Sequence, residues 1–166
     1  MRVKFLKNVA FLVLAATIGM TSAQSAIGES ERNEQGLKGT WLFQISIQDC
    51  NSGVPLGQPF ESLLTFASGG TLTETTANPM FYPAVRSPGH GVWKTSGHHT
   101  YQATSTAFVT LNGVLARTQT ITQTIEVLTE DTLRTTDASV TFYKPDGTLL
   151  ASGCAAATGT RIEMPN

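Results

Sequence analysis

The chain has 166 residues, a length typical of a single domain with one hydrophobic core. Only 14% of the residues are charged and the formal net charge is −1, and beyond the first seven residues no basic cluster follows, which argues against nucleic-acid binding. Thr and Ser fill many polar positions, and because β-branched residues such as Thr fit strands best, the composition predicts an all-β protein.

Residues 1–23 have the pattern of a signal peptide. Small residues at the end of this segment suit cleavage after Ala23, and a basic start precedes an apolar stretch over residues 9–20. That stretch is shorter than the roughly 20 residues of a membrane-spanning helix. The sequence therefore predicts a secreted or periplasmic protein, with no membrane insertion after signal cleavage.

Cleavage changes the charge balance and leaves a polar segment at the new N-terminus. It removes Arg2, Lys4 and Lys7, so eight basic side chains face 12 acidic ones and the formal charge becomes −4. Residues 24–37 are rich in Ser, Glu, Asn, Gln and Gly, which predicts a disordered linker. We expect residues 38–164 to form the folded domain.

The domain shows short stretches of alternating apolar and polar residues, separated by Gly- and Pro-rich turns, as β-strands do. The expected strands cover residues 38–48, 60–67, 71–76, 92–94, 99–111, 114–128, 132–143 and 148–162. Asn112-Gly113 is a strong signal for a type I′ hairpin turn. The one long irregular segment, residues 77–91, follows the third strand and is expected to lie as a loop over one end of the domain. Short links elsewhere predict an eight-stranded antiparallel up-and-down barrel, which leaves no exposed edge.

Cys50 and Cys154 are the only cysteines, and in an exported protein two cysteines most simply form one disulfide. The alternative is two buried free thiols. If the two residues lie opposite each other in the first and last strands, Arg161 lies beside Phe43 and one diagonal step from Trp41. The alternation of the strands then points Trp41 and Arg161 inward and the disulfide outward.

Gly39-Thr40-Trp41 at the start of the first strand, together with Arg161 near the end of the last, resembles the signature of the calycin superfamily, which includes lipocalins and avidin-like proteins. The resemblance implies a closed barrel in which Gly39, Trp41 and Arg161 are structural residues, with Trp41 packed under Arg161 at the closed end. The chain lacks a C-terminal helix of the lipocalin kind, and its mature length is nearer that of avidin-like barrels.

Several polar and aromatic residues are candidates for ligand contacts inside or above the barrel. They lie on strands expected to face inward or in the segment 77–91, and they are Glu74, Tyr82, Arg86, His90, Tyr101, Arg117, Gln119 and Gln123. Small inward residues on the neighbouring strands leave room for a cavity with a few polar groups, the usual form of a small-molecule site. Two other interpretations stay open: the polar residues form an internal network or lie at a wet rim, and His90 only stabilises a turn.

We therefore expect an exported barrel that binds a small, partly apolar molecule in its interior. The alternatives are a cyclase- or isomerase-type enzyme using the same cavity, with Glu74 and His90 or Arg86 in acid-base roles, and a filled barrel that acts as a protein-interaction module. No catalytic motif is recognisable in the chain. The sequence indicates no cofactor and no metal site, and it leaves the oligomeric state open.

Overall fold

The computed structural model describes residues 36–165, so the predicted signal peptide and most of the predicted linker lie outside the described residues. The described part contains one 3₁₀ turn, Pro79–Phe81, and these strands: β1 (Gly39–Gln48), β2 (Phe60–Ala67), β3 (Thr71–Thr76), β4 (Val85–Arg86), β5 (Gly89–Gly97), β6 (Thr100–Leu111), β7 (Val114–Val127), β8 (Thr132–Tyr143) and β9 (Leu149–Arg161). Within residues 36–165, no helix is long and apolar enough to cross a membrane.

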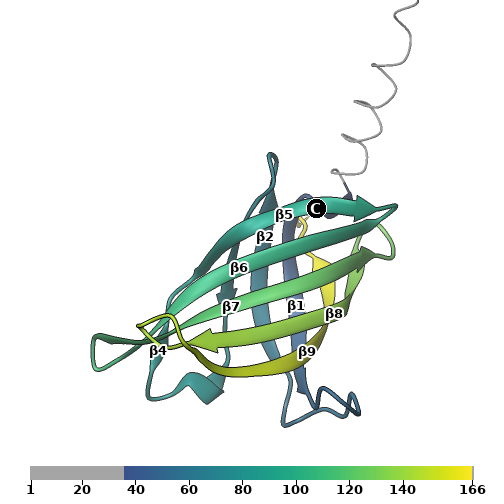
Figure 1. Cartoon of the computed structure of the whole chain (residues 1–166). Coiled ribbons are helices and arrows are strands. Elements are labelled where there is room, and N and C mark those ends of the chain that lie inside the picture. Colours follow the sequence, from purple (N-terminus) through teal and green to yellow (C-terminus); the bar gives the residue numbers. More distant parts are fainter. Residues whose placement is uncertain (1–35, 166) are drawn as a thin grey trace, which may run out of the picture.

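These strands form a closed antiparallel barrel (Figure 1). The sheet runs β4-β6-β5-β3-β2-β1-β9-β8-β7, and pairing of β6 with β7 closes it. Short β4 and the longer β5 pair with successive parts of β6, so the nine segments of the described chain occupy eight strand positions. The eight-stranded up-and-down barrel predicted from the sequence is therefore confirmed, as is the disulfide between Cys50 and Cys154.

The register of β1 against β9 differs from the expected one. Cys154 lies opposite Gln48 rather than Cys50, and Arg161 lies opposite Trp41 rather than beside Phe43. The reason is local, because β1 ends at Gln48 and Cys50 lies in a turn. The shift amounts to two residues, so the alternation is preserved and the inward face of each strand is the predicted one.

The expected long loop over residues 77–91 is also shorter than predicted. β4 already begins at Val85, and after a two-residue break β5 begins at Gly89, with His90 paired to Thr106 of β6. Two glycines that suggested a loop are instead places where a strand meets a close neighbour. A Cβ atom on Gly89 would lie 2.1 Å from Glu74 Oε1, and one on Gly91 would lie 1.9 Å from the Thr104 carbonyl oxygen.

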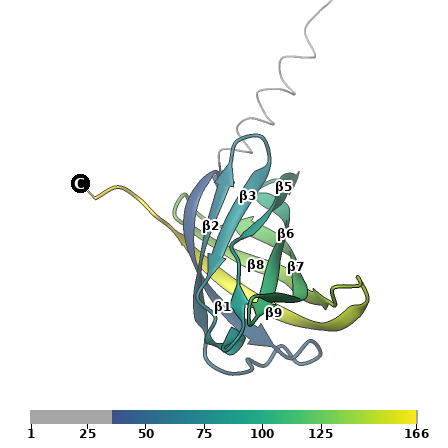
Figure 2. The ribbon, with the colours of Figure 1, turned by 90° about the vertical axis from the view of Figure 1, so that its left-hand side faces the viewer.

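One half of the barrel is filled by a hydrophobic core. Its fully buried members include Trp41, Phe43, Phe66, Tyr101, Ile125 and Leu133. Leu37, at the end of the predicted linker 24–37, is 0% exposed in this core, and its carbonyl accepts a 2.9 Å hydrogen bond from Trp41 Nε1. Packing of the barrel thus begins before β1. At the other terminus, residues 162–165 extend away from the barrel (Figure 2).

Arg161 closes the β1–β9 seam at this filled end. Its guanidinium carbon lies 4.1 Å from the centre of the Trp41 ring. The guanidinium donates hydrogen bonds to the carbonyls of Gly36, Lys38 and Glu130, over 2.9, 2.5 and 2.6 Å. One planar cation therefore ties together the chain entering β1, the β7–β8 turn and the end of β9.

Candidate ligand cavity

A buried ion pair occupies the β3–β4 side of the barrel interior. Arg86 pairs with Glu74, and both side chains are at most 4% exposed. Arg86 also donates to the side-chain oxygen of Gln119 and to the carbonyl of Ser87, while Thr76 Oγ1 donates to Glu74 Oε2 over 2.9 Å. The partner and these hydrogen bonds therefore satisfy the polar atoms of both buried side chains.

The interior beside this network is hollow, since Thr76 and Gln119, which bond to the ion pair, also line a cavity. This cavity of about 370 Å³ lies between β1, β7, β8 and β9, and residues from β2, β3 and the segment after β3 complete its wall. Within the described chain, β4, β5 and β6 contribute no lining residue, because the side chains of β4 and β6 meet in the polar network and core instead. The barrel is therefore neither fully packed nor fully open.

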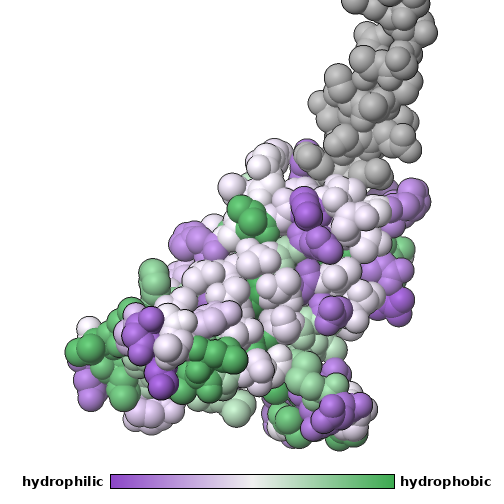
Figure 3. All heavy atoms as spheres, viewed as in Figure 1, coloured by the Kyte–Doolittle hydropathy of each residue, from purple (hydrophilic) through white to green (hydrophobic). Residues whose placement is uncertain are grey.

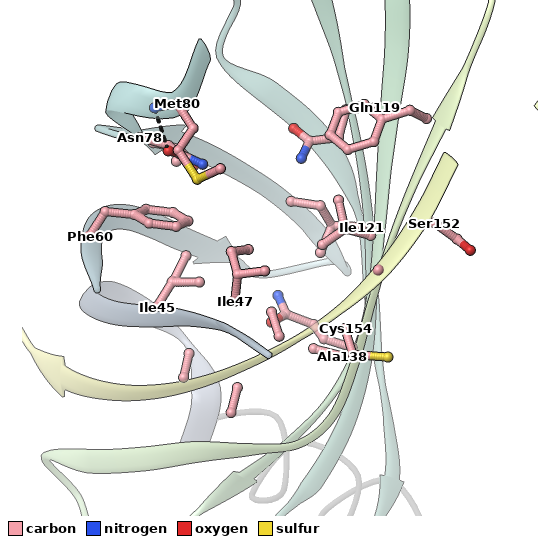
Figure 4. A pocket seen from close by; sticks show the side chains of 18 of the residues that line it. Ile45, Ile47, Phe60, Asn78, Met80, Gln119, Ile121, Ala138, Ser152 and Cys154 are labelled. Atoms are coloured by element: carbon pink, nitrogen blue, oxygen red, sulfur yellow. Dashed lines mark hydrogen bonds between the residues drawn. The ribbon is translucent and has the colours of Figure 1, made fainter. Parts of the chain in front are cut away.

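The wall of the cavity is mainly apolar and contains both small and large side chains. The small residues come from β8 and β9 and include Ala138, Ala151, Gly153, Ala155 and Ala157. The larger lining side chains include Ile45, Ile47, Phe60, Ile121, Val140 and Phe142. Several of them lie beside a small residue on the neighbouring strand, as Ile47 does beside Ala155 and Phe142 beside Ala151. Figure 4 shows Ile45, Ile47 and Ile121 reaching into the same space, whereas Ser152 on β9 points away from it.

The segment between β3 and β4 forms part of this wall. Asn78 starts the 3₁₀ turn, and its side-chain oxygen accepts a 2.9 Å hydrogen bond from the backbone of Met80 (Figure 4). Phe81 then meets Phe142 edge to face at 6.5 Å between ring centres. A short, capped segment thus places Met80 and Phe81 at the cavity, at the end of the barrel where β4 lies.

Exposed apolar side chains surround the same end of the barrel. Figure 3 shows hydrophobic residues gathered around β4 and the tip of the β6–β7 hairpin. The exposed apolar residues on β4 and on the β6–β7 and β8–β9 hairpins include Val85, Leu111, Val114, Leu149 and Leu150. The cavity therefore lies in the half of the molecule whose rim is apolar.

The predicted site residues fall into three groups. Arg117, Gln119 and Gln123 line the cavity, and Glu74 and Arg86 form the adjoining ion pair. Tyr82, His90 and Tyr101 do not line the cavity. The structure thus brings together the predicted residues of β3, β4 and β7.

The three residues outside the cavity have different surroundings. Tyr82 is 88% exposed, and His90 is exposed on the outer face of β5. Tyr101 lies in the filled core, 5.8 Å from the Trp93 ring, and its burial raises the pKa of its hydroxyl above the ordinary value, although the charge of Arg161 acts in the opposite direction. His90 and Glu74, considered together for acid-base chemistry, therefore lie on opposite faces of the sheet.

Sequence reasoning missed most of the apolar lining. The alternation of β1 placed Ile45 and Ile47 inward, but nothing in it separated them from Trp41 and Phe43, which lie on the same face and belong to the core. Met80 and Phe81 fall within residues 77–91, for which the sequence predicts only a loop. Asn is a favourable residue at the start of a helical turn, and hydrophobic residues follow Asn78 closely. This combination is the sequence signal that indicates an ordered segment here.

The residues described here contain no group of three or more His, Cys, Asp or Glu side chains placed to hold a metal ion. Fold and site together define a closed eight-stranded antiparallel barrel with a partly apolar interior cavity. No protein-family model matches the chain, and no curated protein matches it in sequence.

Proposed function

We propose that this protein is an exported carrier that binds a small, partly apolar molecule inside the barrel. The observation that carries the proposal is the cavity of about 370 Å³, which falls in the size range of small-molecule sites and has mostly apolar walls with a few polar groups. Small residues on β9 keep this volume open, whereas the other half of the same barrel is filled by large side chains.

Export through a signal peptide cleaved after Ala23 is part of this proposal. The Cys50–Cys154 disulfide supports it, because disulfides persist in oxidising compartments and are rare in the cytosol. A relationship to the calycin superfamily is likewise proposed. The stacking of Arg161 on Trp41 across β1 and β9 supports that relationship, since it is the contact that the resemblance implies.

The first test is native mass spectrometry of the mature protein purified from its own host, followed by denaturing extraction of any bound molecule. We expect a stoichiometric small molecule that is lost on denaturation. An empty protein that also binds no apolar fluorescent probe would contradict the carrier function.

A matched pair of variants on β9 tests the location of the site. Ala155 lies opposite Ile47 on the inner face, so Ala155→Trp should fill the cavity and abolish binding. Thr158 is exposed on the outer face of the same strand, and Thr158→Trp should leave binding unchanged. Equal binding by both variants would place the ligand elsewhere.

A further inference from the structure

Among the described residues that line the cavity, Arg117 is the only charged one, and none is Asp or Glu. It lies on β7 two residues before Gln119, with its guanidinium carbon 4.9 Å from the centre of the Phe142 ring and 5.8 Å from that of Phe81. The two aromatic rings hold the planar cation at the cavity wall. The cavity thus carries one fixed positive charge beside an apolar chamber.

The other three described arginines all have oxygen acceptors. Arg86 binds Glu74, Arg134 binds Glu126, and Arg161 binds three backbone carbonyls. Arg117 is half-buried, no hydrogen bond or ion pair joins its guanidinium to another described residue, and its Nε atom is buried without a partner. The nearby carboxylate, Glu74, is already engaged by Arg86.

A buried donor without a partner is costly, and the cost is larger for a charged group. An anionic oxygen entering the cavity would supply the missing acceptor. A guanidinium can present two parallel N–H groups to a carboxylate or a similar anion, which gives both affinity and orientation. Apolar walls beside it suit a hydrophobic body attached to that anion.

We propose that the ligand is an apolar molecule with a single anionic group, and that Arg117 binds this group while the body of the molecule lies against β1, β8 and β9. This inference rests on the proposed carrier function and specifies its ligand class. Arg117 is then the residue that selects anionic over neutral molecules of the same shape.

Two fluorescent probes with nearly the same aromatic body separate charge from hydrophobicity. Anilinonaphthalene sulfonate carries one negative charge, and phenylnaphthylamine is its neutral counterpart. We expect the wild-type protein to bind the anionic probe at least about tenfold more tightly, because a charge-assisted hydrogen bond adds to equal apolar contact. Arg117→Gln should abolish this preference by weakening the anionic probe alone.

Arg134→Gln is the matched control, since Arg134 lies on β8 in an exposed pair with Glu126. It should leave both probe affinities unchanged. Arg117→Lys keeps the charge without the planar fork and should retain part of the preference, which provides a second variant if the glutamine substitution impairs folding. Cooperative urea unfolding of each variant shows that the probes report on folded protein.

Each outcome decides one of the two proposals. Equal affinity of the wild type for both probes, or equal weakening of both by Arg117→Gln, would overturn the anionic ligand class while leaving the cavity as a binding site. Failure of both probes to bind the wild type, together with an empty protein in the extraction experiment, would overturn the carrier function itself. A neutral molecule released from the native protein in the extraction experiment would also overturn the role of Arg117.

Discussion

At the residue scale, the same type of side chain has different roles because its partners differ. Arg86 balances a buried carboxylate, Arg161 binds backbone carbonyls at the filled end, and Arg117 faces the cavity without an acceptor. None of these roles follows from the residue type, since all three lie on inward-facing positions of strands. The partner available at each place in the barrel decides the role.

Arg161→Lys should lower the free energy of unfolding by about 1–3 kcal/mol, because a lysine cannot donate to three carbonyls at once and leaves partly buried acceptors unpaired. Urea unfolding followed by tryptophan fluorescence measures the change. Arg134→Lys is the control, and because its pair with Glu126 is exposed, it should cost less than about 1 kcal/mol. Equal losses of unfolding free energy in the two variants would contradict the structural role given to Arg161.

Gly91→Ala should destabilise the protein by about 3 kcal/mol or more, because the added Cβ would meet the backbone of β6 at Thr104 and Ser105, which has little freedom to move. Gly153 on β9 has no atom within 4 Å of the corresponding position. Gly153→Ala should therefore be neutral or slightly stabilising in the same urea experiment. If Gly91→Ala were tolerated as well as Gly153→Ala, the result would contradict the close approach of β5 to β6.

At the scale of elements, polar contacts connect strands that are distant in the sequence. The Glu74–Arg86 pair joins β3 to β4, and Gln119 connects both to β7. This network lies where β4 gives way to β5, and Gly89 leaves the space that the Glu74 side chain occupies. The short break between β4 and β5 is therefore part of the barrel wall and not a loop above it.

Glu74→Gln should reduce the free energy of unfolding by about 3–5 kcal/mol, because it leaves the Arg86 charge buried without its counter-ion. Replacing both residues by Met removes both charges and should recover most of the loss. Urea unfolding of the two variants and of the exposed control Glu126→Gln measures the difference. A double variant no more stable than Glu74→Gln would argue against the uncompensated charge as the cause.

At the scale of the whole molecule, the barrel has a filled half and a hollow half. Large aromatic and aliphatic side chains fill the end closed by Arg161, whereas alanines and glycine on β9 leave the other half open. The disulfide ties the turn after β1 to β9 beside the hollow half, since Cys154 is among the residues that line the cavity. A fixed covalent link there limits how far β1 and β9 can separate.

Amide hydrogen exchange should reveal this asymmetry along single strands. Backbone amides of Val140 and Ala151, beside the cavity, should exchange faster than those of Leu133 and Gly159, beside the core, because local opening costs less where fewer apolar contacts are lost. A bound apolar anion should slow amide exchange mainly at Val140 and Ala151. Uniform exchange along β8 and β9, with and without the probe, would contradict the division into two halves.

Local features of the sequence determined which segments form strands, where several turns lie and which faces point inward. Alternation in residues 39–48 and the Asn112-Gly113 turn, whose residues both have positive φ, needed no information from distant residues. The pairing of the two cysteines also followed from the sequence, because the chain contains only these two and two cysteines in an exported protein most simply form one disulfide. These properties depend on near neighbours in the chain and on the closure of the sheet.

Only the tertiary structure decided the register, the extent of β4 and β5, and the division between core and cavity. Trp41 and Ile47 have the same inward orientation, yet one is packed and the other lines a space, because the side chains facing them come from strands far along the chain. Gly89 and Gly91 suggested a loop, but contacts with Glu74 and Thr104 explain them as strand residues. Residues distant in the sequence decide where the cavity remains open and why Arg117 has no acceptor. The local sequence pattern decides neither.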